Sequence, residues 1–401
     1  MKILKPATKA SPFITKDFVT PVKQRNTTLD VIRGIAITMV LLHHAAIVEK
    51  SAVPGFPFKQ IRLFLCSFTI GGWSGVDLFF VLSGFLVSGL LFKEYNEQRT
   101  INAGRFLIRR FFKIFPSFAV FILLTFLIEQ PLQLGLQSGF SSIDYVKDLF
   151  FLNNYLGGRW ITTWSLDVEE AFYLLLPVFF IFIIARKNMK ARTFLVAYIL
   201  LCVCGIAFRI KSNLEHPAYS FELHYIKTHF RLDALFFGVF LSYLYNYKQE
   251  ELKVFLRKYR VVIVACSALF LLPNFFIRRD DYNWVSVVLL ATNPIFYGGL
   301  IIMAIEFGGV LFKNRFIALV GRNSYAIYLW HAFVNLYMIK YLYSGSVASY
   351  FTYLFTYLAV SIIVGIIMTR LIETPFLRLR ERLFGKKRQP QMVNSELVLK
   401  N

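Results

Sequence analysis

The stretch LDVIRGIAITMVLLHHAAIV, Leu29–Val48, decides the fold because it has the composition of a membrane helix and yet carries ionisable side chains. Asp30 and Arg33 lie at its start, and His43 and His44 lie near its end. Ionisable groups inside a span are costly unless they face protein or a polar cavity. Each of these side chains is therefore a functional candidate.

Arg33 and His44 are eleven positions apart. At 100° per residue this separation is almost three whole turns, so both side chains project from one helix face, about 16 Å apart along the axis. His43 points about 100° away from His44, which favours a packing role. A cation and a potential base on one stripe are suited to hold the two ends of one elongated ligand.

The composition predicts a polytopic membrane protein. Of the 401 residues, 57% are hydrophobic and 44 are Phe, which is too apolar for a soluble domain. The long apolar runs differ from the alternating ten-residue segments of a barrel, so we expect an all-α fold with about ten transmembrane helices in one bundle. The expected spans are residues 31–48, 76–92, 111–129, 166–185, 193–210, 229–247, 260–277, 286–306, 315–339 and 350–372.

Charge placement predicts the orientation. The net charge is +22, and most of the 45 Lys and Arg residues lie in the termini and in the connectors on the same side. The positive-inside rule then places both termini in the cytoplasm. We expect a flexible basic cytoplasmic tail at residues 1–26, a transmembrane domain at 27–377 and a second basic cytoplasmic tail at 378–401. The excess charge also suits anionic lipid headgroups, and a role in nucleic-acid binding is not expected.

Several common site signals are missing from the sequence. It has no Gly-rich phosphate loop, no dinucleotide fingerprint and no HExxH motif, and VLSGF is only part of a nucleophile elbow inside a membrane helix. The four cysteines lie in apolar sequence without metal-ligand spacing, which predicts small buried side chains, no disulfide framework and no metal.

Three further ionisable residues lie at the starts of predicted spans. Asp77 at the mouth of the second span either orients a sugar hydroxyl or is solvated. Arg231 and Asp233 form either a packing pair within the membrane or part of a substrate site. Small residues near Asp77, such as Gly75 and Gly84, predict close helix packing.

The basic segment before the third span is open to two interpretations. Arg105, Arg109 and Lys113 are spaced i, i+4, i+8 and so share one helix face. Their spacing favours an anchor at the headgroups, and the alternative is a phosphate clamp, because guanidinium groups match phosphate bidentately.

The segment TTWSLDVEEAFYLLLP, residues 162–177, begins a strongly apolar helix with three acids, Asp167, Glu169 and Glu170. The helix dipole favours carboxylates there. Three of them exceed what capping requires, so we expect one to face an internal cavity. Farther along, His331 has the features of a packing residue, and Glu373 precedes Pro375, which is expected to stop the last span.

Seven motifs in order resemble the membrane-bound acyltransferase-3 family, bacterial inner-membrane proteins that O-acylate surface glycans and some secreted metabolites. The similarity covers nearly everything from Leu29 to Phe376. The motifs are LDVIRGIAITMVLLHH, GGWSGVDLFFVLSGFL, RFLIRRFFKIFP, TTWSLDVEEAFYLLLP, FRLDALFFG, GRNSYAIYLWH and ETPF. The resemblance implies an acyl-CoA donor, usually acetyl-CoA, taken from the cytosol, and an acceptor on the opposite side. We expect no soluble esterase-like domain of the kind that some relatives append.

The resemblance also implies roles for individual residues. The family's basic-x10-His motif falls on Arg33 and His44, which makes His44 the catalytic base, with Glu169 as orienter or substrate acid. The implied donor-phosphate ligands are Arg33, Arg109, Arg110 and Lys113, and the residues that bind or shape the acceptor site are Asp77, Trp164, Ser165, Glu170, Tyr173, Arg231 and Asp233.

The expected function is transfer of an acyl group, acetyl above all, from CoA to a hydroxyl of a surface polysaccharide or its lipid-linked precursor. Direct transfer and an acyl-His relay both remain open. The alternatives are a transporter or glycan flippase, which would move solute without consuming CoA, and an acyltransferase for a secreted small molecule such as a macrolide. The sequence identifies neither the acceptor sugar nor the oligomeric state.

Overall fold

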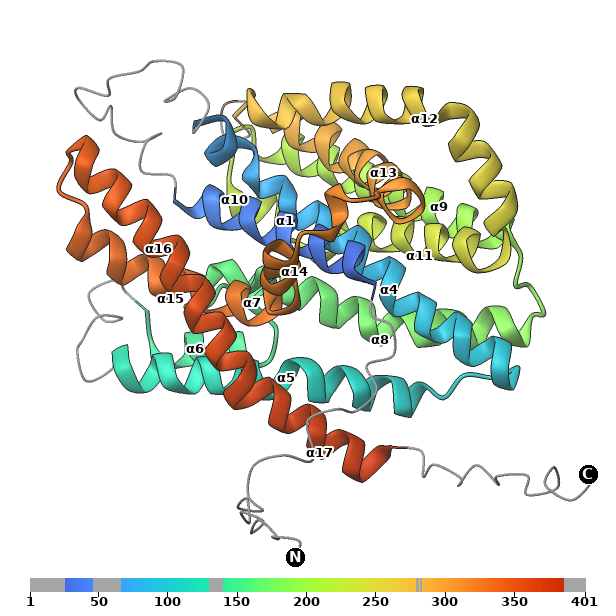
Figure 1. Ribbon diagram of the computed structural model, residues 1–401, viewed down its shortest axis with the longest axis horizontal. Coiled ribbons are helices and arrows are strands. Elements are labelled where there is room, and N and C mark those ends of the chain that lie inside the picture. The colour runs from blue at the N-terminus through green and yellow to red at the C-terminus, as the bar shows by residue number, and fades with distance from the viewer. Residues whose placement is uncertain (1–25, 46–65, 130–139, 279–280, 282, 386–401) are drawn as a thin grey trace, which may run out of the picture.

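A computed structural model describes residues 26–45, 66–129, 140–278, 281 and 283–385. Throughout these ranges the regular structure is helical (Figure 1). The all-α class expected from the sequence is confirmed for this part of the chain. The principal helices are α1 (Thr27–His44), α4 (Gly75–Gln98), α5 (Ala103–Glu129), α6 (Ser142–Leu149), α7 (Asn153–Leu156), α8 (Trp164–Ala185), α9 (Ala191–Glu215), α10 (Phe221–His224), α11 (Leu232–Tyr247), α12 (Gln249–Leu271), α13 (Asn283–Phe307), α14 (Arg315–Arg322), α15 (Ser324–Leu342), α16 (Val347–Met368) and α17 (Thr374–Phe384).

Six helical segments are long and apolar enough to cross a membrane. Four other predicted spans coincide with α1, α11, α12 and the α14–α15 pair, which do not meet that standard. Six spans are therefore supported within the described ranges, and the expected count of about ten is not confirmed. The six segments are Cys66–Gln98, Ala103–Glu129, Ile161–Ala185, Ala191–Glu215, Asn283–Phe307 and Val347–Phe384.

The distribution of side chains fits an apolar solvent. Helix α8 exposes large apolar side chains such as Leu174, Val178 and Phe182, whereas the interior holds fully buried Arg209 and Arg231. A water-soluble protein shows the opposite preference for charged residues. Together with the long apolar helices, this distribution indicates an integral membrane protein. None of the four cysteines is fully buried, so the expectation of buried thiols was wrong.

Helices α4 and α11 pack against each other through two glycines. A Cβ atom at Gly84 would collide with the carbonyl oxygen of Leu235 on α11, and one at Gly238 would collide with the carbonyl oxygen of Val81 on α4. This reciprocal contact confirms the close packing expected for the small residues of the second span.

We expect Gly84→Ala to destabilise the protein by about 1–3 kcal/mol, because the new methyl group must push α11 away. The measurement is the thermal midpoint of the purified protein in detergent. Gly89→Ala is the matched control, since the nearest neighbour of a Cβ atom there is the Ser242 hydroxyl at 3.4 Å. Equal midpoints for the two variants would contradict the packing assignment.

The predicted span 315–339 is not one helix. It is broken at Asn323 into α14 and α15, because the Asn323 side chain donates to the Leu319 carbonyl (2.8 Å) and so competes with the helix ladder. The short α14 packs closely on α1, where Gly321 lies against the carbonyl of Asp30.

Pro375 does not stop the last helix, contrary to expectation. The chain makes one π-helical turn over Thr369–Glu373 and continues as α17. Proline has no N–H, and its ring clashes with the carbonyl four positions earlier, so a wider turn accommodates it. The Thr374 hydroxyl donates to the Thr369 carbonyl at 2.9 Å and holds this turn.

Candidate functional site

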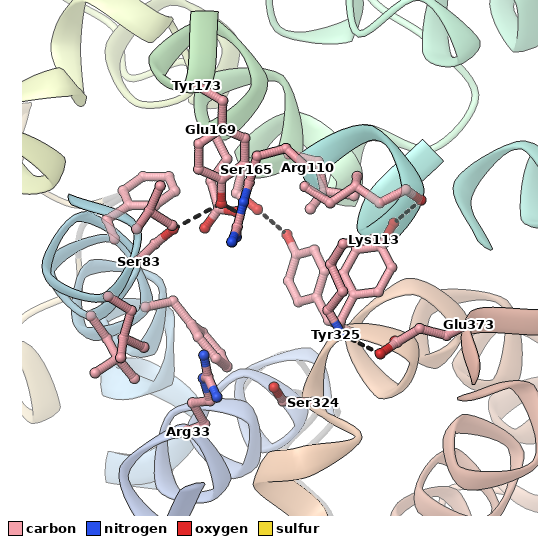
Figure 2. A pocket seen from close by; sticks show the side chains of 18 of the residues that line it. Arg33, Ser83, Arg110, Lys113, Ser165, Glu169, Tyr173, Ser324, Tyr325 and Glu373 are labelled. Carbon is pink, nitrogen blue, oxygen red and sulfur yellow. Dashed lines mark hydrogen bonds and ion pairs between the residues drawn. The ribbon is translucent and has the colours of Figure 1, made fainter. Parts of the chain in front are cut away.

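A cavity of about 520 Å³ lies between α1, α4, α5, α8, α14, α15 and the π turn with α17 (Figure 2). Helix α4 provides an apolar wall that includes Phe79, Phe80 and Leu86. The other walls carry six cationic side chains and two acidic ones. The cations are Arg33, Arg109, Arg110, Lys113, Arg322 and Arg380, and the acids are Glu169 and Glu373.

The cationic wall converges from four elements far apart in the sequence. Arg110 and Lys113 extend from α5, and Arg33 points into the cavity from α1 (Figure 2). Arg109 of α5 also lines the cavity. Arg105, which was predicted to share a helix face with Arg109 and Lys113, instead pairs with Glu94 at 3.5 Å and does not line the cavity. The excess of guanidinium groups makes the cavity suitable for a ligand with several negative charges, phosphates above all.

Two ion-pair systems hold three of these six cations in place. Buried Asp30 pairs with Arg33 at 3.5 Å and with Arg322 at 3.4 Å, which joins α1 to α14. Lys113 donates to Glu373, the residue that the π turn places on the cavity wall. Arg33, Lys113 and Arg322 are therefore held by ion pairs in the absence of a ligand.

The carboxylate side of the cavity comes from α8. The Tyr173 hydroxyl donates to Glu169 at 2.7 Å and is 2.9 Å from the Ser83 hydroxyl of α4 (Figure 2). Glu169 lines the cavity, as the excess of acids in this helix suggested. Glu170 is not a lining residue, and its Oε1 atom has no hydrogen-bond partner within the described ranges.

His44 does not line the cavity, but a chain of ring contacts connects it to residues that do. Its ring centre is 4.8 Å from that of His331, which is 5.4 Å from that of Tyr328. The Tyr328 hydroxyl is 2.7 Å from the Ser165 hydroxyl, and both residues line the cavity. The candidate base His44 is thus separated from the Ser165–Tyr328 end of the cavity by the His331 ring.

The tautomer of His44 follows from its main-chain contact. Its Nδ1 atom lies 2.9 Å from the Val40 carbonyl oxygen, which can only accept a hydrogen bond. Nδ1 therefore carries the proton, and Nε2 is the basic nitrogen. Asn335 holds the backbone of His44 by donating to its carbonyl at 2.9 Å, whereas the neighbouring His43 ring contacts the Thr69 carbonyl at 2.6 Å.

The sequence profile of the acyltransferase-3 family, described as an acyltransferase domain, matches residues 26–370. The chain belongs to the acyltransferase-3 family. The cavity and the histidine contacts lie almost entirely within the matched region, and only Glu373, Leu377 and Arg380 of the cavity wall follow it.

Similar proteins from Staphylococcus aureus carry names that refer to O-acetyl transfer. The chain is 27% identical over 369 residues to a provisionally named O-acetyltransferase of strain COL, and 25% identical over 352 residues to the O-acetyltransferase OatA of strain MRSA252. These alignments cover 87% and 82% of this chain, but 56% and 57% of the relatives, so the chain spans little more than half their length. No solved structure matches the chain with significance.

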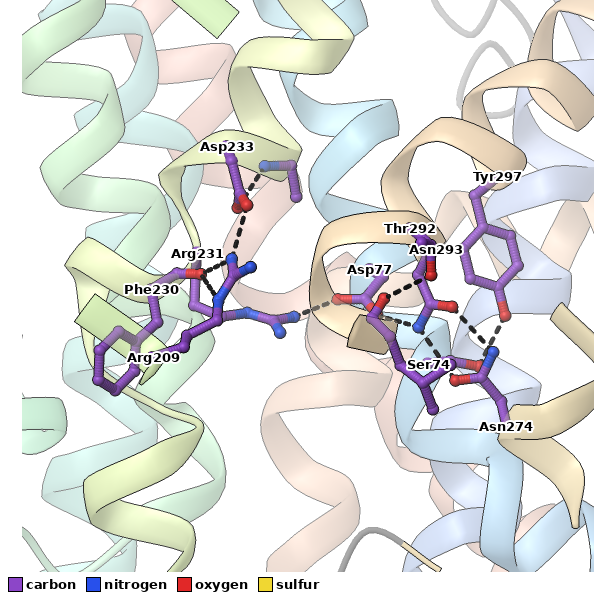
Figure 3. A network of polar contacts seen from close by, with 12 residues as sticks. Ser74, Asp77, Arg209, Phe230, Arg231, Asp233, Asn274, Thr292, Asn293 and Tyr297 are labelled. Atoms are coloured by element: carbon purple, nitrogen blue, oxygen red, sulfur yellow. Dashed lines mark hydrogen bonds and ion pairs between the residues drawn. The ribbon is translucent and has the colours of Figure 1, made fainter. Parts of the chain in front are cut away.

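Three predicted acceptor residues of this acyltransferase-family chain lie in a separate buried network (Figure 3). Arg231 binds Asp77, and the Arg209 guanidinium donates to Asp233 at 2.6 Å. Arg231 and Asp233 therefore have different ion-pair partners, which contradicts the direct pair that was one of the two alternatives for these residues, and Asp77 is fully buried and not solvated.

The partners of this network explain why it is stable without a ligand. Asn293 donates to Asp77 at 2.7 Å, and the guanidinium carbon of Arg231 lies 4.7 Å from the centre of the Tyr225 ring and 5.5 Å from that of Trp164. Buried charges need this degree of compensation. Trp164 is buried in this network and does not line the cavity, whereas Ser165 and Tyr173 do.

Several cavity residues were not predicted as site residues from the sequence. They are Ser83, Arg322, Ser324, Tyr325, Tyr328, Glu373 and Arg380. Most of them lie inside motifs that carried the family resemblance, such as GRNSYAIYLWH and ETPF. Those motifs contained a usable signal, because polar residues within apolar helices mark interior sites.

Proposed function

We propose that this protein is a membrane-bound O-acetyltransferase that transfers the acetyl group of acetyl-CoA to a hydroxyl of a cell-surface polysaccharide or its lipid-linked precursor. One observation carries the proposal. In a chain of the acyltransferase-3 family, a cation-lined cavity is connected by ring contacts to His44, whose own ring is oriented by a main-chain carbonyl. The names of the S. aureus relatives support acetyl transfer to oxygen.

The donor is assigned to the cavity on charge and shape. CoA carries phosphates at one end of a thin pantetheine arm, and the guanidinium groups of Arg33, Arg109 and Arg110 suit those phosphates. The apolar wall from α4 suits the pantetheine arm. In this arrangement the arm extends toward the Ser165–Tyr328 end of the cavity. The thioester must pass this hydroxyl pair to reach His44, so we propose that Tyr328 moves during each cycle.

The proposed reaction is direct transfer. His44 Nε2 removes the proton of the acceptor hydroxyl while its oxygen attacks the thioester carbon, and the C–S bond breaks as the new C–O bond forms. The proton on His44 then passes to the CoA thiolate, so the products are the acetyl ester and CoA. Polar groups at the Ser165–Tyr328 end of the cavity stabilise the negative charge that develops on the thioester oxygen.

The decisive test is CoA release by the purified protein. We expect free thiol to appear only when acetyl-CoA and an acceptor glycan are both present, and acetyl ester to appear on the glycan in equal amount by mass spectrometry. A transporter or flippase would move solute across a vesicle membrane without producing free CoA. That result would refute the proposal.

We expect Glu169→Gln to lower kcat by about tenfold while leaving the KM for acetyl-CoA unchanged or lower. The kcat falls because the variant loses the carboxylate that is proposed to orient the reacting groups. The KM does not rise, because removal of one negative charge makes the cavity more positive and so favours the anionic donor. Glu250→Gln on α12 is the control for loss of one carboxylate, since Glu250 is 84% exposed. An unchanged kcat in Glu169→Gln would place this residue outside the reaction.

A further inference from the structure

His331 on α15 is a fully buried imidazole that the proposed mechanism does not use. Its ring stands edge-on to the His44 ring, with centres 4.8 Å apart and planes inclined by 66°. One turn farther along α15, Asn335 donates to the His44 carbonyl at 2.9 Å. Helix α15 therefore contacts His44 at both its ring and its backbone.

The hydrogen-bonding state of His331 is defined by the main chain. Its Nδ1 atom contacts the Tyr328 carbonyl oxygen, which can only accept, so Nδ1 carries the proton. The lone pair is therefore on Nε2, and that atom has no hydrogen-bond partner within the described ranges. A buried polar atom without a partner is costly, and an apolar side chain would fill the space without that cost. Packing alone does not account for a histidine here.

We propose that His331 is a positioning residue for His44 in acyl transfer, an inference that rests on the proposed function. The neutral His331 ring is oriented before the reaction by the Tyr328 carbonyl, and its lone pair favours the positive charge that His44 acquires on taking the hydroxyl proton. Oriented dipoles of this kind need no reorganisation in the transition state. His331 itself neither gains nor loses a proton.

The same contacts connect the donor cavity to the base. Tyr328 lines the cavity, and its backbone carbonyl orients His331. The Tyr328 hydroxyl is held by Ser165 Oγ at 2.7 Å and by the Thr162 carbonyl. Movement of Tyr328 on donor entry is thus linked through α15 to the imidazole that faces His44.

The test compares His331→Leu, which removes both nitrogens, with His331→Gln, whose amide can donate to the Tyr328 carbonyl and offer an acceptor. We expect His331→Leu to lower kcat by about 10- to 100-fold, with the KM for acetyl-CoA and the thermal midpoint close to those of the wild type. We expect His331→Gln to recover most of the lost kcat. A merely structural role predicts no such split between kcat and KM and no rescue by the amide.

Wild-type kcat in His331→Leu would overturn the inference, and so would equal losses of kcat in both variants. Nitrogen NMR of labelled histidine in the wild-type protein provides a readout that needs no variant. We expect a protonated Nδ1 and a bare Nε2 at His331, and the opposite tautomer would overturn the inference. If the wild-type protein releases no CoA when acetyl-CoA and a glycan are present, the proposed function fails. This result is distinguishable from failure of the His331 inference, which requires an active wild-type protein.

Discussion

His44→Ala is expected to lower kcat for acetyl transfer by about 10²–10⁴-fold, the usual contribution of a general base. Donor binding should persist, because His44 does not line the cavity in which the phosphates are proposed to lie. The measurement is acceptor-dependent CoA release by purified protein, together with the thermal shift that CoA produces. The variant should also leave surface glycans unacetylated in cells while remaining in the membrane.

His43→Ala is the matched control for this experiment. The His43 ring contacts the Thr69 carbonyl at 2.6 Å, and its direction on the helix differs from that of His44 by about 100°, so its loss should leave most of the activity intact. Near-normal acetylation by His44→Ala would refute the assignment of the base. If both variants were equally inactive with intact folding, the catalytic role would not be specific to His44.

The same preparation separates direct transfer from an acyl-His relay. We expect wild-type protein incubated with radiolabelled acetyl-CoA, without acceptor, to retain no label after denaturation, since direct transfer forms no covalent intermediate. Stable label on the wild-type chain, absent from His44→Ala, would establish the relay in its place.

The sequence could predict which helix face a residue occupies, but it could not predict which helix lies opposite. The i, i+4 spacing placed Arg109 and Lys113 on one face of α5, and both line the cavity. Their convergence with Arg33 was expected only from the family resemblance. Periodicity describes one helix at a time, and a cavity is formed by several.

Two errors show the same limit. A pair between Arg231 and its neighbour Asp233 was one of two alternatives, yet Arg231 binds Asp77, which is 154 positions away. Glu373 was expected to lie just before a proline that ends the helix. In the structure a π turn carries Glu373 into the cavity, and this turn depends on how the chain accommodates Pro375. Neither long-range pairing nor a π turn has a local sequence pattern strong enough to predict it.

Arg33→Ala is expected to weaken CoA binding by about 10- to 100-fold, which is the range for losing a charge-assisted hydrogen bond to phosphate. Arg33 projects into the cavity opposite Glu169 and Tyr173, so a small rotation of its guanidinium from Asp30 would bring it to an anionic ligand inside the cavity (Figure 2). Asp30 keeps Arg322 as a partner at 3.4 Å, which should limit the cost in stability.

The measurement is the Kd for CoA by calorimetry, supported by the thermal shift at saturating ligand. Arg105→Ala controls for loss of one positive charge in the same basic region, because Arg105 pairs with Glu94 and does not line the cavity.

The Kd of Arg33→Lys for CoA should fall between those of the wild type and Arg33→Ala, since lysine keeps the charge but loses the bidentate geometry. The dependence on ionic strength should decrease in Arg33→Ala, because one fewer cation attracts the ligand. An unchanged Kd in Arg33→Ala, with a weakened Kd in Arg105→Ala, would move the donor to a different surface of the bundle and leave Arg33 with a purely structural pairing to Asp30.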